Sequence, residues 1–200
     1  MSKRIDYYFS ISSPWSYLGH QRFLEIATKY GAEIVPHVPD LAKVFPASGG
    51  LPLPKRAPQR QAYRMVELKR WQKKLGIAFN PVPRFFPVKG DPSALLTIAA
   101  LAAKGAPAAL GLAGALMRGA WAEERDLGDV ATLKSIVAAQ PFDAESLYSQ
   151  SVKPETQANY ERMTQEAIDA QVFGAPWYVY NSEPFWGQDR LIFLEQALAA

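Results

Sequence analysis

The sequence predicts an α/β fold in which a long helical block separates two short segments that contain strands. Three observations support this prediction. Residues 5–40 have the pattern strand, helix, strand, residues 59–170 have helical patterns, and residues 176–199 have the pattern strand, strand, helix. The predicted order is therefore βαβ, a helical block, then ββα. The crossover of the opening βαβ unit is expected to be right-handed.

The opening unit has a recognisable signal for each element. Residues 5–11, IDYYFSI, are rich in the β-branched and aromatic types that suit a buried strand. Ser13 followed by Pro14 indicates a helix start, because serine accepts from free N–H groups and proline fits the first helical position. Residues 32–40 are predicted to form a second strand, whose end is broken by two prolines, the first of them Pro36.

The rest of the chain is divided by glycine and proline. We expect a loop over residues 41–58, two strands over residues 176–187 joined at Asn181-Ser182, and a closing helix over 188–199. The predicted helices between them cover residues 59–75, 92–103, 107–122, 129–139 and 154–170.

Composition excludes several classes of function. The 200 residues are 48% hydrophobic and 20% charged, as is common for a soluble globular protein, and the net charge of +3 is too small to predict nucleic-acid binding. The absence of cysteine excludes disulfides, thiolate metal sites and catalysis by the protein's own thiol. With two histidines, a metal site is not expected. The start MSKRIDYYFS does not fit a secretory signal, so we expect a cytoplasmic protein.

The most apolar stretch of the chain, residues 94–117, raises the question of a membrane span. Lys104, Gly105 and Pro107 interrupt it. We therefore interpret it as two buried helices and expect no membrane partner.

The segment Ser13-Pro14-Trp15-Ser16 lies where a redox protein would carry Cys-x-x-Cys. One interpretation is that Ser13 is an ordinary N-cap, which stabilises a helix by about 1 kcal/mol. The other is that Ser13 and the free N–H groups of the helix start hold the ionised thiol of a cofactor, because a helix N-terminus favours an anion. Ser16 is expected to be more buried.

Two further turns have the same double interpretation. Ala175-Pro176 comes just before a predicted strand, and it is either a simple turn or a cis-proline site that presents backbone groups to an extended ligand. Gln188-Asp189 follows Gly187 at a helix entry, and it is either a cap or a site for the amino-acid end of a ligand.

Five stretches together carry a family resemblance. They are DYYFSISSPWSYLG, RQAYRMVELKRWQKKLGI, the FFPV loop, VFGAPWYV and FWGQDRL. With these, the chain resembles the 2-hydroxychromene-2-carboxylate isomerase family, which is related to kappa-class glutathione transferases and to DsbA. The resemblance implies a thioredoxin-like fold with a large all-helical insertion. It also implies a discontinuous thioredoxin-like domain of residues 1–40 and 171–200, an inserted helical domain of residues 41–170, and a homodimer.

The resemblance implies reduced glutathione as the cofactor. Ser13 would contact its sulfur, Ala175 before cis-Pro176 would pair with its cysteinyl backbone, and Gln188 and Asp189 would hold its γ-glutamyl end. Relatives often have Asn-Asp or Ser-Asp in place of Gln188-Asp189, so Gln188 departs from the family pattern. The implied reaction is the cis–trans isomerisation of an aromatic ring-cleavage product through reversible addition of the thiolate to a double bond.

Candidate substrate contacts come from the inserted region. Phe85 and Phe86 either line an aromatic pocket or belong to the core. The basic stretch from Lys55 to Lys74 is either a solvated helix face or a source of cations for the substrate carboxylate, with Arg56 and Arg60 as the candidates. His20 is expected to face either the pocket or solvent.

Two other functions stay open. One is a kappa-class-like transferase or peroxidase, which would consume glutathione. The other is a non-catalytic DsbA-like binding module, which would not bind glutathione. A dithiol oxidoreductase is excluded because neither position of the Ser-x-x-Ser segment can form a disulfide.

Overall fold

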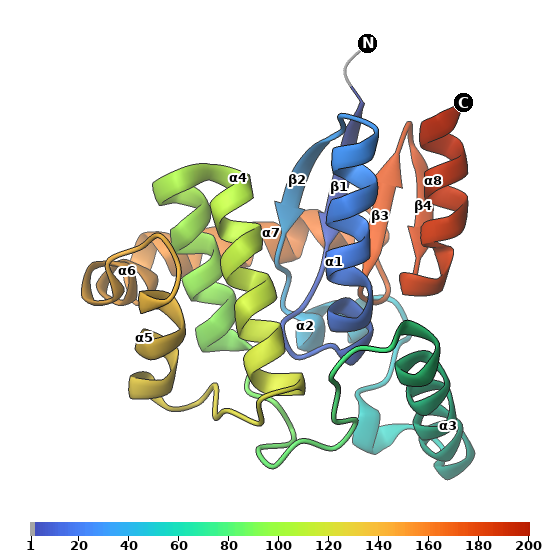
Figure 1. Cartoon of the computed structure of the whole chain (residues 1–200), viewed down its shortest axis with the longest axis horizontal. Helices are drawn as coiled ribbons and strands as arrows, with labels where there is room; N and C mark the ends of the chain where they lie inside the picture. Colours follow the sequence, from blue (N-terminus) through green and yellow to red (C-terminus); the bar gives the residue numbers. More distant parts are fainter. Residues whose placement is uncertain (1–2) are drawn as a thin grey trace.

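The structure is a computed structural model that describes residues 3–200, and it contains one mixed sheet built from both ends of the chain. The sheet consists of β1 (Arg4–Tyr8), β2 (Glu33–His37), β3 (Trp177–Tyr180) and β4 (Glu183–Trp186), in the order β2-β1-β3-β4 (Figure 1). β1 is parallel to β2 and antiparallel to β3, and β3 is antiparallel to β4. The predicted βαβ and ββα units therefore share one sheet, in which β1 and β3 are the central strands.

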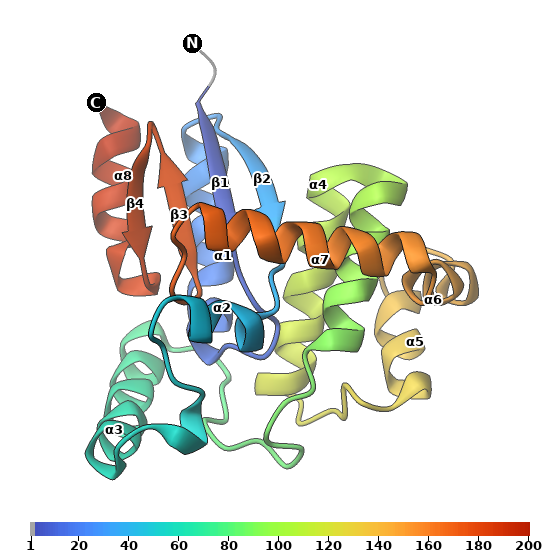
Figure 2. The ribbon, with the colours of Figure 1, turned by 180° about the vertical axis from the view of Figure 1, so that it is seen from behind.

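Helices cover both faces of this sheet. α1 (Pro14–Lys29) and α8 (Leu191–Ala199) lie on one face, and α7 (Pro154–Asp169) crosses the other (Figures 1 and 2). The aromatic rings of Tyr7, Phe23 and Tyr178 pack together under α1, with the Tyr7 and Tyr178 rings stacked at 5.2 Å between centroids. All three side chains are fully buried. This aromatic core packs α1 against the sheet.

The inserted segment supplies the remaining helices. In chain order they are α2 (Leu41–Ala47), the 3-10 turn η1 (Leu53–Lys55), α3 (Pro58–Leu75), α4 (Asp91–Trp121), α5 (Val130–Ala138), α6 (Ala144–Ser151) and α7. α4, α5 and α6 form a bundle beside the β2 edge of the sheet, whereas α2 and α3 lie near one end of the strands (Figures 1 and 2). That end of the strands is also where α1 begins.

α4 is folded back on itself. Its backbone leaves the helical conformation at Gly105 (φ 76°, ψ −179°), just before Pro107, and its two halves lie side by side (Figure 1). By length and composition α4 could cross a membrane, but each half is shorter than the roughly 20 residues that a span needs. The prediction of two helical segments in this region is confirmed.

Several predicted boundaries were wrong. Pro36 lies inside β2, paired with Tyr7, and it is tolerated there because β2 is an edge strand with one neighbour. The predicted loop over residues 41–58 contains α2, whose cap Asp40 accepts from the Ala42 amide at 2.8 Å. α6 was not predicted, although Asp143 caps it in the same way, accepting from Ser146 N at 2.7 Å.

The first strand and the last helix also differ from their predicted bounds. The first strand ends at Tyr8, before residue 11. The closing helix begins as the 3-10 turn η2 (Gln188–Arg190) before α8.

Candidate active site

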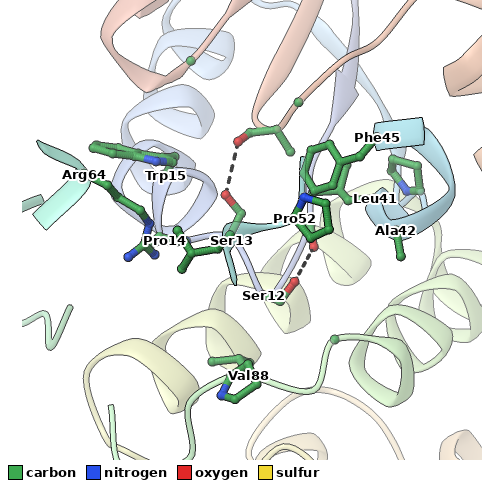
Figure 3. A pocket seen from close by; sticks show the side chains of 18 of the residues that line it. Ser12, Ser13, Pro14, Trp15, Leu41, Ala42, Phe45, Pro52, Arg64 and Val88 are labelled. Carbon is green, nitrogen blue, oxygen red and sulfur yellow. Dashed lines mark hydrogen bonds between the residues drawn. The ribbon is translucent and has the colours of Figure 1, made fainter. Parts of the chain in front are cut away.

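A cavity of about 1130 Å³ opens at the N-terminal end of α1. Its walls come from the start of α1, from α2 and α3, from the loop that enters α4, and from the segments on either side of β3 and β4 (Figure 3). Residues that are far apart in the sequence therefore meet there. The volume is sufficient for a tripeptide-sized ligand together with a small aromatic acid, since ligand pockets are commonly about 300–1,000 Å³.

Ser13 lies at the base of this cavity and is the N-cap of α1. Its Oγ accepts from the Ser16 amide at 3.2 Å and donates to the Ala175 carbonyl oxygen at 3.2 Å (Figure 3). The side chain is buried apart from the part that lines the cavity. Capping and a position at the ligand cavity are thus two properties of one hydroxyl, and the two interpretations of Ser13 are compatible.

Ala175 approaches Ser13 from the segment before β3. The Ala175–Pro176 peptide bond is cis, and the Pro176 carbonyl accepts from the Gly187 amide at 2.9 Å. Ala175 lines the cavity whereas Pro176 does not. Ala175 therefore lies beside the start of α1, with its carbonyl oxygen accepting from Ser13.

Gln188 and Asp189 behave differently from each other. The Gln188 side chain is 1% exposed, packs against Gly19 of α1, and accepts through Oε1 from Arg22 Nη1 at 2.8 Å. Gln188 also lines the cavity, with its amide oxygen engaged by Arg22, and its contact with a ligand stays a prediction. Asp189 lines the cavity with 42% of its side chain exposed and 3.7 Å from Arg190.

Gly187 shapes the same turn. Its φ of 97° lies in the left-handed region, and a Cβ there would be 2.6 Å from Asp189 Oδ1. Only glycine leaves the Asp189 carboxylate in this position without strain.

Arg56 and Arg60 both line the cavity, as does Arg64, which the sequence did not single out. Arg56 donates to the Leu51 carbonyl at 2.7 Å and lies over the Phe45 ring of α2. Burial, followed by repulsion from Arg60, lowers the pKa of Arg56. Among residues 3–200, none of the three arginines forms an ion pair with a carboxylate, so the group favours an anionic ligand.

Phe85 and Phe86 are separated by the structure. Phe86 lines the cavity and its ring meets Trp121 edge-on at 6.3 Å. Phe85 does not line the cavity, and Arg84 lies over its ring at 5.3 Å. Phe85 is therefore not a wall of this pocket.

His20 faces neither the cavity nor solvent, contrary to both expected positions. It is 4% exposed, its Nε2 lies 3.0 Å from the Leu110 carbonyl, and its Nδ1 lies 3.2 Å from the Tyr7 hydroxyl. Because a carbonyl only accepts, Nε2 donates and the neutral ring accepts from Tyr7 through Nδ1. Burial lowers the pKa of His20 to about 4. Ser16, also buried, accepts from the Ser10 amide at 3.3 Å.

Sequence reasoning missed several other groups that line the cavity. Tyr160 of α7 donates to Asp91 Oδ1 at 2.9 Å, and both residues line the cavity. Leu41 and Phe45 line it from α2, the helix that was predicted as a loop. For Tyr160 the sequence gives no local signal, because its role depends on where α7 crosses the molecule.

Known proteins resemble this chain over nearly its whole length. The chain matches the family model described as a DSBA-like thioredoxin domain over residues 4–199. A protein of Sphingobium xenophagum named 2-hydroxychromene-2-carboxylate isomerase is 31% identical over 199 residues, a match that covers 99% of each chain. Glutathione S-transferase kappa 1 of Caenorhabditis elegans is 26% identical, over 98% of this chain and 90% of that one.

A solved structure of a 2-hydroxychromene-2-carboxylate isomerase is similar over the same extent. It aligns with a TM-score of 0.85 at 27% identity and covers 98% of this chain and 94% of its own. The thioredoxin-like fold with a helical insertion is therefore confirmed, and the chain belongs to the DSBA-like thioredoxin domain family.

Proposed function

We propose that the protein is a glutathione-dependent cis–trans isomerase of an aromatic ring-cleavage product such as 2-hydroxychromene-2-carboxylate, which it converts to trans-o-hydroxybenzylidenepyruvate. The observation that carries the proposal is the pairing of Ser13 with Ala175 in a large cavity of a chain that has no cysteine. The isomerase and transferase names of the relatives support an enzyme of this general type.

The residues present fit glutathione. The cavity offers a hydroxyl at a helix N-terminus, the backbone of Ala175 before a cis proline, the Asp189 carboxylate for an ammonium group, and arginines for carboxylates. When bound, glutathione supplies a thiolate for reversible addition to a conjugated double bond, which allows rotation about that bond.

The protein's own residues would bind and orient glutathione and the substrate, and would stabilise the thiolate. Ser13 and the free amides at the start of α1 favour a negative charge at that end of the helix. Arg56 and Arg60 would hold the substrate carboxylate, and Phe86 would provide an apolar wall beside it. In this proposal the anionic sulfur and the substrate carboxylate are held by different residues of the cavity.

The first test is calorimetric titration with reduced glutathione of the wild type and of Asp189→Ala. We expect saturable binding that weakens several-fold in the variant, because the ammonium group loses its counter-charge. Absence of binding by the wild type at millimolar glutathione would contradict the proposal and favour a non-catalytic binding module.

The second candidate function is a kappa-class-like transferase or peroxidase, which the 26% identical kappa-class relative favours. A time course with substrate distinguishes the two activities. Isomerisation leaves the concentration of glutathione constant, whereas conjugation or peroxide reduction consumes it.

A further inference from the structure

Arg64 places a positive charge at the end of α1 that Ser13 caps. It lies on α3, which contacts α1, and it lines the same cavity as Ser13. Its side chain points toward the first turn of α1, beside Pro14 and Trp15 (Figure 3). The helix N-terminus and the guanidinium therefore act on the same region of the cavity.

This charge has no anionic partner within residues 3–200. Arg64 forms no ion pair there, and its Nη1 contacts Met65 Sδ at 3.7 Å. Burial, followed by repulsion from Arg56, lowers the pKa of Arg64. A partly buried guanidinium without a counter-ion is unfavourable. A bound anion would remove that cost.

The carboxylates of the cavity do not supply this counter-ion, because each has another partner. The pairs are Asp40 with the Ala42 amide, Glu67 with Arg70, Asp91 with Tyr160, and Asp189 with Arg190. The remaining cations that line the cavity are Arg56, Arg60, Lys89 and Arg190, the partner of Asp189, and Tyr63 is a further ionisable group. Arg56 is turned toward α2 by its contacts with Leu51 and Phe45, whereas the Arg64 side chain points toward the start of α1 (Figure 3).

We infer that Arg64 stabilises the thiolate of the glutathione bound at the N-terminus of α1. The inference rests on the proposed function and adds a residue to it. A cation within a few ångströms favours the ionised form of a thiol, in addition to the effect of the helix dipole. Arg64 therefore acts on the sulfur, whereas Arg56 and Arg60 serve the substrate carboxylate.

The test measures the ionisation of bound glutathione without any substrate. Wild type and Arg64→Gln are saturated with glutathione, and the ultraviolet absorbance of the thiolate is followed as a function of pH. We expect the pKa of the bound thiol to be about one unit higher in Arg64→Gln, so that the thiolate-to-thiol ratio at neutral pH falls about tenfold. Arg64→Lys, which keeps the charge, should remain near the wild type.

Lys69→Gln is the matched control, because Lys69 lies exposed on the same helix and does not line the cavity. It should leave the thiol pKa unchanged. An Arg64→Gln protein that binds glutathione with the wild-type thiol pKa would overturn the inference and leave the proposed function intact.

A second combination of results would also overturn the inference. If Arg64→Gln no longer bound glutathione, and Arg64→Lys bound it without the wild-type thiol pKa, Arg64 would hold a carboxylate of glutathione and not its thiolate. Failure of the wild type to bind glutathione would instead refute the proposed function itself.

Discussion

The His20 Nε2 donates to the Leu110 carbonyl at 3.0 Å and thereby joins α1 to the second half of α4. The same ring accepts from Tyr7 of β1. One neutral imidazole thus links the sheet, the helix that carries Ser13 and the inserted helical block. The protonated ring could not accept from Tyr7, so this link depends on pH.

The first prediction is a loss of stability between pH 6.5 and about pH 4. The pKa of His20 is about 4 in the folded chain and 6.5 in the unfolded chain, so in this interval the unfolded state binds a proton that the folded state does not. Stability should therefore fall with decreasing pH, by up to about 3 kcal/mol from this group. Urea unfolding of the wild type and of His20→Gln across this pH range measures the free energy of unfolding of each protein. The same pH dependence of this free energy in both proteins would contradict the prediction.

The second prediction concerns the close contact between α1 and η2. A Cβ at Gly19 would lie 2.6 Å from Gln188 Cβ, so Gly19→Ala should displace Gln188 and cost about 1–3 kcal/mol of stability. Because Asp189 follows directly, glutathione affinity should fall as well. The control is Gly111→Ala in α4, where the nearest atom is 3.9 Å away and a gain of up to about 1 kcal/mol is expected. Equal stabilities of the two variants would refute the steric argument.

The third prediction separates capping from catalysis at Ser13. Ser13→Ala should lose about 1 kcal/mol for the cap, a further contribution from the hydrogen bond to the Ala175 carbonyl, and most of the turnover. Asp143→Ala removes the cap of α6, which lies outside the cavity, and should lose about 1 kcal/mol with normal turnover. Thermal unfolding and isomerase assays on both variants provide the comparison. Wild-type turnover in Ser13→Ala would exclude the proposed role of the hydroxyl.

The fourth prediction concerns the substrate carboxylate. Arg60→Gln removes a cavity cation that has no ion-pair partner within residues 3–200, so the KM for the aromatic carboxylate should rise about tenfold with a smaller change in kcat. Steady-state kinetics at saturating glutathione tests this. A substrate amide that lacks the carboxylate should be handled equally by variant and wild type, and unequal handling would argue for a structural role.

The elements with local signals were predictable from the sequence. Ser13-Pro14 begins a helix where expected, Asn181-Ser182 joins two strands, and Gly105 and Pro107 divide the apolar region. In each case the residue type itself restricts the backbone, so neighbouring residues are enough to make the prediction.

The features that were missed depend on distant residues. The Gln188 side chain is turned toward Arg22 and Gly19 of α1, and its neighbours in the sequence do not indicate this orientation. His20 is buried because α4 folds back and presents Leu110 to it. Arg64 resembles its exposed neighbours in a basic helix, and only the packing of α3 near α1 distinguishes it. No pattern within a short window contains this information.

The Ser13–Ala175 hydrogen bond has a consequence for ligand selectivity. The donor and the acceptor are both buried, and each satisfies the other when no ligand is bound. A serine hydroxyl has one hydrogen, so a sulfur that takes it releases the Ala175 carbonyl, which then needs a donor. A ligand with both an acceptor and an amide N–H replaces the Ser13–Ala175 hydrogen bond by two, one from Ser13 to its acceptor and one from its N–H to the Ala175 carbonyl. A small thiol without an amide leaves a buried carbonyl unpaired, at a cost of about 1–3 kcal/mol. The site should therefore discriminate against simple thiols by leaving its own backbone unsatisfied, before any contact with the rest of the ligand is counted.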